Sequence, residues 1–323
     1  MGAFTVVKTL GIESTAHTFG VGMVKDEDII SNIHNMYIPK KGGIHPGEAA
    51  DHHSKIAGEI VEKALIDTPD YIAYACCPGL GPCLRIGAVI AKYLAIKFKI
   101  PIIPVNHAEA HIDIGIKTTG AKDPVIVYVS GGNTQIIANH GGWKIFGETL
   151  DIAIGNAIDK LARELDMSHP GGPKLENLAK GGKFIEMPYT VKGMDLSYSG
   201  ILTHAKNLLK THSKKDVAYS FQEHIFSMLI EVSERAIAHT EKEEILLVGG
   251  VAKNSKLKNM FKIMCKDRGI KLKVVPDEFA GDNGAMIAYS GYLKAKQEFT
   301  ITPERVNYFQ RIRVDQDLRE LFK

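Results

Sequence analysis

Short apolar runs alternate along this chain with longer stretches in which apolar residues recur every three or four positions. The short runs have the length of buried strands, and they cover residues 4–10, 19–24, 71–77, 101–105, 125–129, 245–248 and 272–275. The longer stretches predict helices, such as the one over residues 46–66, whose apolar residues form a single stripe. Because strands and helices follow one another in turn, the pattern predicts a largely parallel sheet with helices on its faces.

The pattern restarts at Pro124. A strand over residues 125–129, a turn with two glycines and a return strand over residues 135–138 repeat the hairpin that opens the chain at residues 4–24. Each half then closes with strand–helix units. The sequence therefore predicts a duplicated α/β fold with two lobes and a cleft between them.

The domain boundaries follow from this repeat. We expect an N-terminal α/β lobe over residues 1–123 and a C-terminal α/β lobe over residues 124–323. The second lobe carries an extended insertion at about residues 151–242, which is predicted to be helical because it ends in a long amphipathic pattern. Functional loops in such folds gather at the carboxyl ends of strands.

Composition and charge exclude few classes of protein. With 323 residues, of which 45% are hydrophobic and 24% charged, the chain is an ordinary globular protein. A net charge of +3 is no strong sign of nucleic-acid binding, although basic residues gather between Lys253 and Arg268. No run approaches the roughly 20 apolar residues that span a bilayer, and no signal peptide is evident. The four cysteines lack the spacing of a zinc ribbon. Because no export signal is evident, we expect a cytoplasmic protein with reduced thiols.

Two histidines at the end of a predicted strand are the first candidates for chemistry. His107 and His111 are four residues apart, so on a helix both imidazoles lie on one face and could share one metal ion. Glu109 lies roughly 200° around the helix from each histidine and cannot join them. The pair is therefore half a metal site, and its other ligands must come from elsewhere. A bare pair at this spacing is also compatible with two ordinary histidines near a helix start.

Glycine pairs follow three predicted strands or loops and predict a nucleotide site. They are Ser130-Gly131-Gly132, Gly171-Gly172 and Gly249-Gly250, where a backbone can approach a ligand closely. Asp159 and Glu176 lie on predicted helices nearby, and carboxylates there could accept hydrogen bonds from ribose hydroxyls. The alternative for each carboxylate is an ordinary charge on a helix surface.

Two oxygen donors could complete the metal site. Asp282 precedes the last long helix and could meet His107 and His111 across the cleft, although it could instead cap that helix. Tyr128, at the end of its own strand, could be the fourth ligand. Two nitrogens with carboxylate and phenolate oxygens suit zinc or iron and do not choose between them.

Ten stretches, in order along nearly the whole chain, carry a family pattern. They are Gly11–Gly20 (GIESTAHTFG), His45-Pro46 with His52-His53, the His107/His111 pair, Tyr128–Gln135 (YVSGGNTQ), and the segments DIAIGNAIDKLAREL, HPGGP, MDLSYSG, SFQEH, GGVAKN and DNGAMIA. Together they resemble the TsaD/Gcp family, once labelled O-sialoglycoprotein endopeptidases. The resemblance is greatest to the archaeal and eukaryotic branch, which is the catalytic subunit of the KEOPS complex.

The resemblance implies a fold and an activity. The fold is the two-lobed one of actin, sugar kinases and heat-shock chaperone ATPases, with nucleotide and metal in the interlobe cleft. The activity is transfer of threonylcarbamoyl from threonylcarbamoyl-adenylate to the exocyclic amine of the adenosine 3′ of the anticodon, in tRNAs that decode codons beginning with A. The implied cofactors are one iron or zinc ion per chain and an adenine nucleotide. The implied partners are tRNA, the KEOPS kinase and small accessory subunits.

The resemblance also implies site residues. The metal ligands would be His107, His111, Tyr128 and Asp282. The nucleotide contacts would be Tyr128, Val129, Ser130, Gly131, Gly132, Asp159, Gly172, Glu176 and Asn254. It assigns no catalytic side chain.

Three positions depart from the family pattern. Gly47 stands where the family usually has arginine, Cys77 where a glycine is usual, and Ala280 where a cysteine is frequent. None of them removes a proposed ligand. The first departure leaves this chain without a contact to tRNA or substrate by that arginine.

We therefore predict a metal-dependent acyl-type transferase that acts on tRNA, in which the metal polarises the carbonyl of the intermediate as a Lewis acid. The nucleophilic amine comes from the RNA, which accounts for the lack of a Ser-His-Asp or Cys-His arrangement. A metalloprotease is one alternative, but it requires a His-Glu-x-x-His helix that the chain lacks. A sugar kinase would need a catalytic aspartate beside a sugar pocket, and a non-enzymatic ATP switch has no use for the histidine pair.

Overall fold

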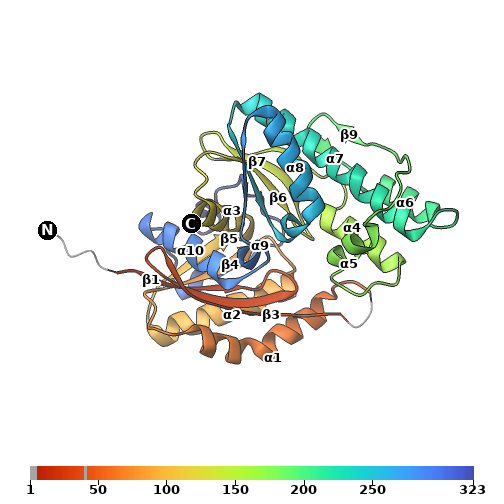
Figure 1. The fold of residues 1–323 in the computed structure, drawn as a ribbon. Helices are drawn as coiled ribbons and strands as arrows, with labels where there is room; N and C mark the ends of the chain where they lie inside the picture. Colours follow the sequence, from red (N-terminus) through yellow and green to blue (C-terminus); the bar gives the residue numbers. More distant parts are fainter. Residues whose placement is uncertain (1–5, 40–41) are drawn as a thin grey trace. The chain divides into compact units, whose positions relative to one another are not determined.

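The computed structural model describes residues 6–39 and 42–323, and the chain forms two compact units (Figure 1). The described part of the first unit runs to Pro39 and continues over Gly43–Ile114 and Gly281–Lys323. The second unit comprises Gly115–Ala280 and Gly42. Each unit is built around one five-stranded mixed sheet.

The sheet of the first unit has the strand order β3-β2-β1-β4-β5. Its strands are β1 (Lys8–Glu13), β2 (Thr18–Lys25), β3 (Asp28–Met36), β4 (Tyr71–Cys77) and β5 (Ile102–Asn106). The first three strands form an antiparallel meander, whereas β4 and β5 run parallel to β1. The parallel strands are apolar and buried, as expected for strands covered on both faces.

Helices cover both faces of this sheet. They are α1 (Pro46–Ala64), α2 (Gly81–Phe98), α3 (His107–Thr119), which begins in this unit, α10 (Gly284–Lys296) and the short α11 (Leu318–Leu321), with a 3₁₀ turn η2 (Pro303–Arg305). Helices α1 and α2 lie below the sheet in Figure 1, and α10 lies above it. A side chain at Gly11 or Gly22 of the sheet would overlap the backbone of α10 at Ala288 or Ala285. The glycines thus let α10 pack backbone to backbone on β1 and β2.

The sheet of the second unit has the order β12-β11-β6-β7-β8 and repeats the topology of the first. Its strands are β6 (Val125–Val129), β7 (Thr134–Asn139), β8 (Trp143–Glu148), β11 (Glu244–Val248) and β12 (Lys271–Val274). Strands β6, β7 and β8 form the meander, and β11 and β12 are parallel to β6. The repeated order agrees with the duplication inferred from the sequence.

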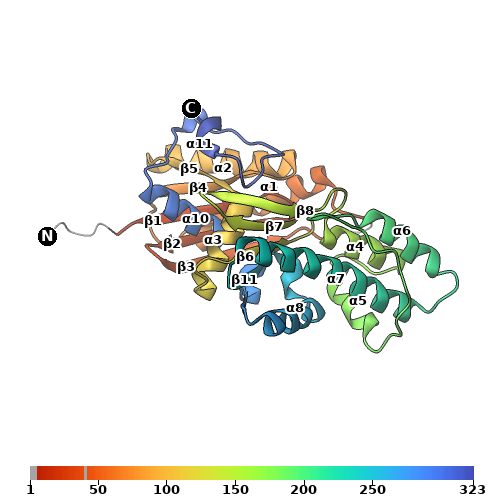
Figure 2. The ribbon, with the colours of Figure 1, turned by 90° about the horizontal axis from the view of Figure 1, so that it is seen from above.

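The other elements of this unit are mainly helical (Figure 2). They are α4 (Ile154–Glu164), α5 (Gly172–Ala179), β9 (Val191–Lys192), β10 (Asp195–Leu196), α6 (Ser199–Leu208), α7 (Lys214–Thr240), η1 (Gly250–Lys253), α8 (Ser255–Arg268) and α9 (Asp277–Ala280). The stretch predicted as a helical insertion contains α4 to α7 and also the two short strands. Its long helix α7 buries Phe221, Ile225 and Leu229 in the core of the unit.

The first strand and two of the four edge strands differ from the prediction. A strand was expected over residues 4–10, but β1 ends at Glu13, and residues 4 and 5 lie outside the described part of the chain. The outer strands β3 and β8 were not predicted. Strand β3 is polar and only partly buried, unlike the buried edge strand β5, so its sequence carries little apolar signal.

The composition of the units also differs from the predicted lobes. The segment Gly281–Lys323, which was assigned to the C-terminal lobe, packs with the N-terminal sheet, and the division between the units falls at Ile114 rather than residue 123. Ile301, Leu318 and Phe322 belong to the apolar core of the first unit. The physical reason is the close packing of α10 on β1 and β2, which order along the chain does not reveal.

Across residues 6–39 and 42–323, no helix is long and apolar enough to cross a membrane.

Candidate metal centre and nucleotide-binding residues

The end of β5 places the two histidines. Asn106, the last residue of the strand, is buried, and its Oδ1 accepts a hydrogen bond from the backbone N–H of Ala108 (2.9 Å). This bond caps the start of α3, so the helix begins at His107 itself. Both His107 and His111 consequently lie in the first turns of α3 and on one face.

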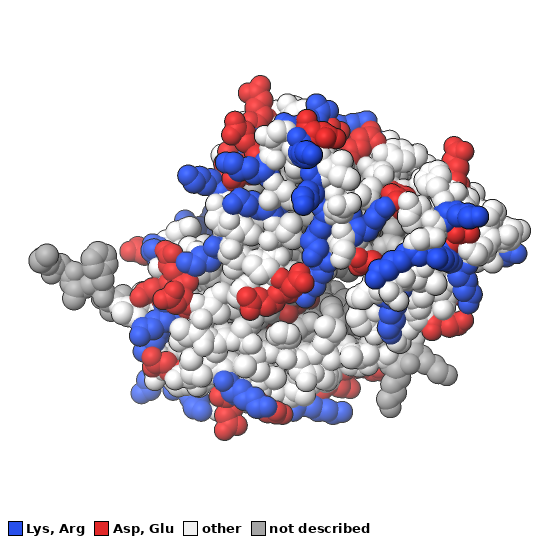
Figure 3. Space-filling view, viewed as in Figure 1, with Lys and Arg blue, Asp and Glu red and all other residues white. Residues whose placement is uncertain are grey.

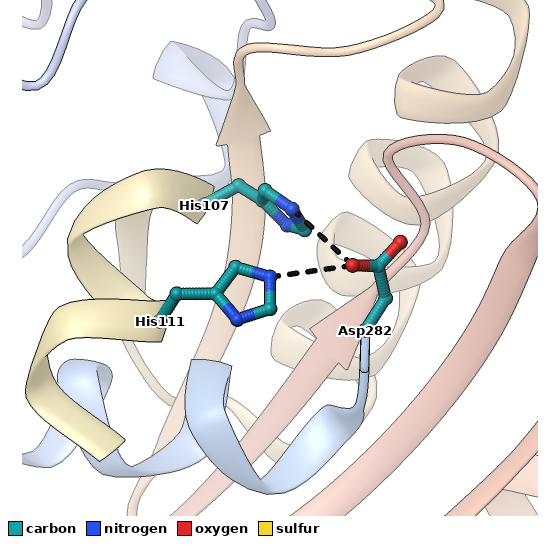
Figure 4. Close-up of side chains that lie close together, drawn as sticks. All are labelled: His107, His111 and Asp282. Carbon is teal, nitrogen blue, oxygen red and sulfur yellow. Dashed lines mark hydrogen bonds and ion pairs between the residues drawn. The ribbon is translucent and has the colours of Figure 1, made fainter. Parts of the chain in front are cut away.

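Asp282 comes to the histidines from the turn before α10. The cap of that helix is the next residue, Asn283, whose Oδ1 accepts a hydrogen bond from Met286 N (3.0 Å). The capping role considered for Asp282 is therefore filled by its neighbour, and its carboxylate is directed toward the histidines (Figure 4).

The three side chains form a compact set of donors. Asp282 Oδ1 lies 3.3 Å from His111 Nε2 and 3.5 Å from His107 Nε2. One ligand atom from each of the three side chains can be chosen so that all lie within 4.8 Å of one another. Two imidazole nitrogens and one carboxylate oxygen in this arrangement fit a zinc or iron ion that takes further ligands. Asp282 belongs to the same unit as the histidines, so their approach is internal to that unit.

Glu13 is a functional candidate that the sequence analysis missed. Its side chain is 0% exposed, and Oε2 accepts a hydrogen bond from His107 Nδ1 (2.8 Å). Its Oε1 accepts from the backbone N–H and the hydroxyl of Thr15 (2.7 and 2.6 Å). A carboxylate on Nδ1 fixes the imidazole ring and leaves Nε2 for a metal. A single carboxylate shortly after the predicted strand 4–10, among apolar and hydroxyl residues, was the signal that could have revealed it.

Charges around the histidines favour a cation at this site. Burial lowers the pKa of His107, but the carboxylates of Glu13 and Asp282 outweigh it and raise the pKa to about 9. Burial would raise the pKa of Asp282, yet His107 and His111 hold it well below its usual range. One fully buried carboxylate and one partly buried carboxylate thus lie beside two imidazoles, and one added positive charge, whether a proton or a metal ion, is stabilised there.

Tyr128 lies in the second unit, buried at the end of β6. Its hydroxyl accepts a hydrogen bond from Asn133 Nδ2 (3.3 Å) across the turn that follows. Its assignment as a fourth metal ligand stays a prediction.

The turn after β6 exposes its glycines. Ser130 Oγ accepts hydrogen bonds from the backbone N–H groups of Gly132 (3.3 Å) and Asn133 (3.0 Å), which folds the turn tightly. A Cβ added at Gly131 or Gly132 would have no neighbour within 4 Å. The space beside these two glycines is therefore open to a ligand, while Val129 before the turn is buried in the strand.

Asp159 organises the loop that leads into α5. Its Oδ1 accepts a hydrogen bond from Gly171 N (2.8 Å), and its Oδ2 lies 3.3 Å from His169 Nδ1. Gly172 is the first residue of α5. The carboxylate thus has a structural role that neither the nucleotide assignment nor the surface-charge alternative predicts, and a ribose contact remains a prediction.

Glu176 and Asn254 meet at the start of α8. Glu176 Oε1 accepts a hydrogen bond from the backbone N–H of Ser255 (2.9 Å), and Asn254 caps the helix through Leu257 N (2.9 Å). Asn254 Nδ2 also donates to Gln222 Oε1 (3.2 Å). The structure therefore brings these two predicted nucleotide residues together, beside the end of β11.

Comparisons with known proteins agree on one family. The model of the protein family TsaD, described as tRNA N6-adenosine threonylcarbamoyltransferase, matches residues 28–289 of this chain. A protein of Thermococcus sibiricus with that name is 52% identical over 95% of this chain and 98% of its own length. Proteins with the same name from Thermococcus kodakarensis and Archaeoglobus fulgidus are 55% and 52% identical, over 87% and 89% of this chain and 90% and 91% of their own lengths.

Solved structures confirm the fold. HypF of T. kodakarensis matches 90% of this chain with a TM-score of 0.64 and a sequence identity of 16%. The match covers 48% of the HypF chain. The activator of 2-hydroxyisocaproyl-CoA dehydratase from Clostridium difficile, with bound ADPNP, has a TM-score of 0.54 at 12% identity, covering 91% of this chain and 97% of its own. Identities this low show the shared two-lobed α/β fold alone.

Proposed function

Because the chain belongs to the tRNA N6-adenosine threonylcarbamoyltransferase family, we propose that it transfers threonylcarbamoyl from threonylcarbamoyl-adenylate to the exocyclic amine of an adenosine in tRNA. The target is the adenosine 3′ of the anticodon in tRNAs that decode codons beginning with A. The observation that carries the proposal is the 52% identity to a transferase of this name over 95% of the chain. The donor set of His107, His111 and Asp282, which could hold a metal ion, also supports the proposal.

His107, His111 and Asp282 would hold one divalent metal ion, iron or zinc, with Tyr128 as a further ligand. When bound, such an ion supplies a Lewis acid that polarises a carbonyl. Glu13 orients His107 through the hydrogen bond to Nδ1, and its charge offsets that of the ion. The amine that attacks belongs to the tRNA, so the protein's own task is to bind and orient the two substrates.

The adenylate would bind to the second unit at the carboxyl ends of β6 and β11. In parallel α/β sheets this edge is where ligands bind, and the open glycine turn at Ser130–Gly132 supports the assignment. Tyr128, Val129, Asp159, Gly172, Glu176 and Asn254 are the remaining contacts in this proposal. Structures of the same fold with bound nucleotide, including a HypF and the dehydratase activator, are consistent with it.

Protein partners are part of the proposal. We propose that the chain works in the cytoplasm with the KEOPS kinase and small accessory subunits. Helix α2 presents three large apolar side chains at helical spacing, and they are 60%, 61% and 57% exposed at Val89, Tyr93 and Ile96. A stripe of this kind is typical of a surface that a second protein covers, which supports a partner for the first unit.

The test of this function is transfer to tRNA. Purified chain, partner subunits and chemically prepared threonylcarbamoyl-adenylate are incubated with unmodified tRNA that decodes an A-starting codon, and the nucleosides are analysed by mass spectrometry. We expect threonylcarbamoyladenosine at the position 3′ of the anticodon, and none in a transcript with guanosine there. Unmodified adenosine after incubation with the metal-loaded, nucleotide-binding complex would contradict the proposal.

A further inference from the structure

The three proposed metal ligands come from two distant parts of the sequence. His107 and His111 lie on α3, whereas Asp282 lies 171 positions after His111, directly before α10. Because the two segments are far apart in sequence, only packing between them can fix the distance between their side chains. The geometry of the donor set therefore depends on how α3 and α10 are held together within the first unit.

One ion pair joins these two helices. Glu109, between the two histidines in sequence, lies on α3, and its Oε2 lies 2.8 Å from Nζ of Lys294 on α10. The side chains are 24% and 12% exposed, so the pair is largely removed from water. Glu109 lies on the side of α3 that faces away from the two histidines. It contacts α10, the helix that follows Asp282.

A second carboxyl group of α3 lies near the same lysine. Asp113, one turn after Glu109 on α3, interacts electrostatically with both Glu109 and Lys294. Loss of the lysine charge therefore leaves Glu109 and Asp113, one helical turn apart, without the cation that both of them face. Loss of the Glu109 charge leaves Lys294 with Asp113. Lys294 is consequently the more important member of the pair.

Exposed ion pairs of the same chemistry offer a contrast. Lys63 and Glu59 form a pair within α1 (2.6 Å), and their side chains are 57% and 65% exposed. Such a pair is screened by water and contributes little. The Glu109–Lys294 pair differs in its burial and in joining two segments that both carry metal ligands.

We propose that Glu109 and Lys294 are positioning residues, which hold α3 and α10 at the separation that lets His107, His111 and Asp282 bind one metal ion. The inference depends on the metal site proposed above. Neither residue is a ligand, so their effect on the metal is indirect and passes through the two helices.

The test measures metal affinity rather than activity. Dissociation constants for Zn²⁺ are determined by chelator competition for the wild type, Lys294→Met, Glu109→Gln, Lys294→Arg and the control Lys63→Met, with circular dichroism as a check of folding. We expect Lys294→Met to weaken Zn²⁺ binding by about tenfold or more, as loss of supporting contacts does at metal sites, and Glu109→Gln to weaken it less. Lys294→Arg, which keeps the charge, should restore most of the affinity. Lys63→Met should bind as the wild type does.

The possible outcomes separate the two proposals. Unchanged Zn²⁺ affinity in folded Lys294→Met overturns the positioning role. If that variant does not fold, the double variant Glu109→Gln/Lys294→Met, which leaves no unpaired charge between them, takes its place and is expected to show the same loss. Failure of the wild type to bind Zn²⁺, Fe²⁺ or Co²⁺ would instead contradict the metal site itself.

Discussion

The carboxylate of Glu13 accepts a hydrogen bond from His107 Nδ1 at 2.8 Å, in the fully buried interior of the first unit. Glu13 ends β1 and His107 begins α3, so this bond joins the central strand of the sheet to the helix that carries both histidines. A buried carboxylate needs a partner of positive charge, and His107 provides one only when it is protonated or bound to a metal ion. If His107 carries neither a proton nor a metal ion, the buried carboxylate of Glu13 is therefore left without a positive partner.

Replacing Glu13 by Gln tests this connection. The variant keeps the shape of the side chain but removes the charge that supports His107, and we expect metal affinity to fall about 10- to 100-fold. In the metal-free variant the pKa of His107 should also fall, because the carboxylate charge that raises it is gone. Chelator competition measures the first effect and NMR titration of the imidazole the second. Unchanged values of both would refute the supporting role.

The packing of α10 leads to a second prediction. A Cβ at Gly22 would overlap the backbone of Ala285, so Gly22→Ala must displace α10 and with it the preceding Asp282. We expect a loss of stability of at least about 1–3 kcal/mol, as for overpacking in a core, together with weaker metal binding. The matched control is Gly58→Ala in the exposed part of α1, where nothing lies within 4 Å.

In the control, alanine replaces glycine within a helix, so its stability should rise by roughly 0.5–1 kcal/mol. Denaturant unfolding of both variants checks the pair of predictions. Equal stability of the two would show that the contact between sheet and helix is not as tight as described.

One substitution can separate the structural role of Glu176 from its proposed role in nucleotide binding. Glu176→Ala removes the hydrogen bond to Ser255 N, which should cost about 0.5–1.5 kcal/mol of stability. If the carboxylate also binds ribose, adenine-nucleotide affinity should fall by about 1.5–3 kcal/mol, with metal content unaffected. Calorimetry is the measurement, and Glu164→Ala, which breaks an exposed ion pair with Lys206, is the control. Unaltered nucleotide affinity would leave Glu176 with its structural role alone.

Sequence reasoning found the histidine pair because helical spacing is a local property, and α3 has that spacing. Asp282 could be suggested from its place before a helix, but its contact with the histidines depends on packing between distant segments. Glu13 and Lys294 escaped notice for the same reason, since their partners lie 94 and 185 positions away. The sheet strands with apolar sequences were predicted well, whereas polar edge strands such as β3 were not, because their pattern carries little information on burial.

The chain by itself should modify tRNA poorly. Basic residues of α8 are the best candidates for holding RNA, but Lys256, Lys258 and Arg268 are paired with Glu223, Asp277 and Glu234. Figure 3 shows acidic side chains interspersed with the basic ones on this face. Basic residues paired with carboxylates give little long-range attraction for a polyanion, so we expect partner proteins to supply affinity for tRNA.

This expectation is checked by comparing transfer rates with and without the partner subunits at moderate salt, with threonylcarbamoyl-adenylate supplied in both reactions. Equal rates would refute dependence on partners. Tight binding of tRNA by the lone chain, with a steep dependence on salt, would identify α8 as the RNA-binding surface after all.

The most direct test of the account is whether threonylcarbamoyl transfer requires a metal ion bound by His107, His111 and Asp282. Both histidines are buried, so His111→Gln, which fills more of the space than alanine, is the variant of choice. Metal content and threonylcarbamoyladenosine formation are measured together for the wild type, the chelator-treated and reconstituted wild type, His111→Gln and the exposed control His140→Ala. We predict about one ion per chain in wild type and control, with transfer lost on chelation, restored by iron or zinc, and absent in His111→Gln. Full transfer by metal-free protein, or normal metal content in folded His111→Gln, would contradict the account.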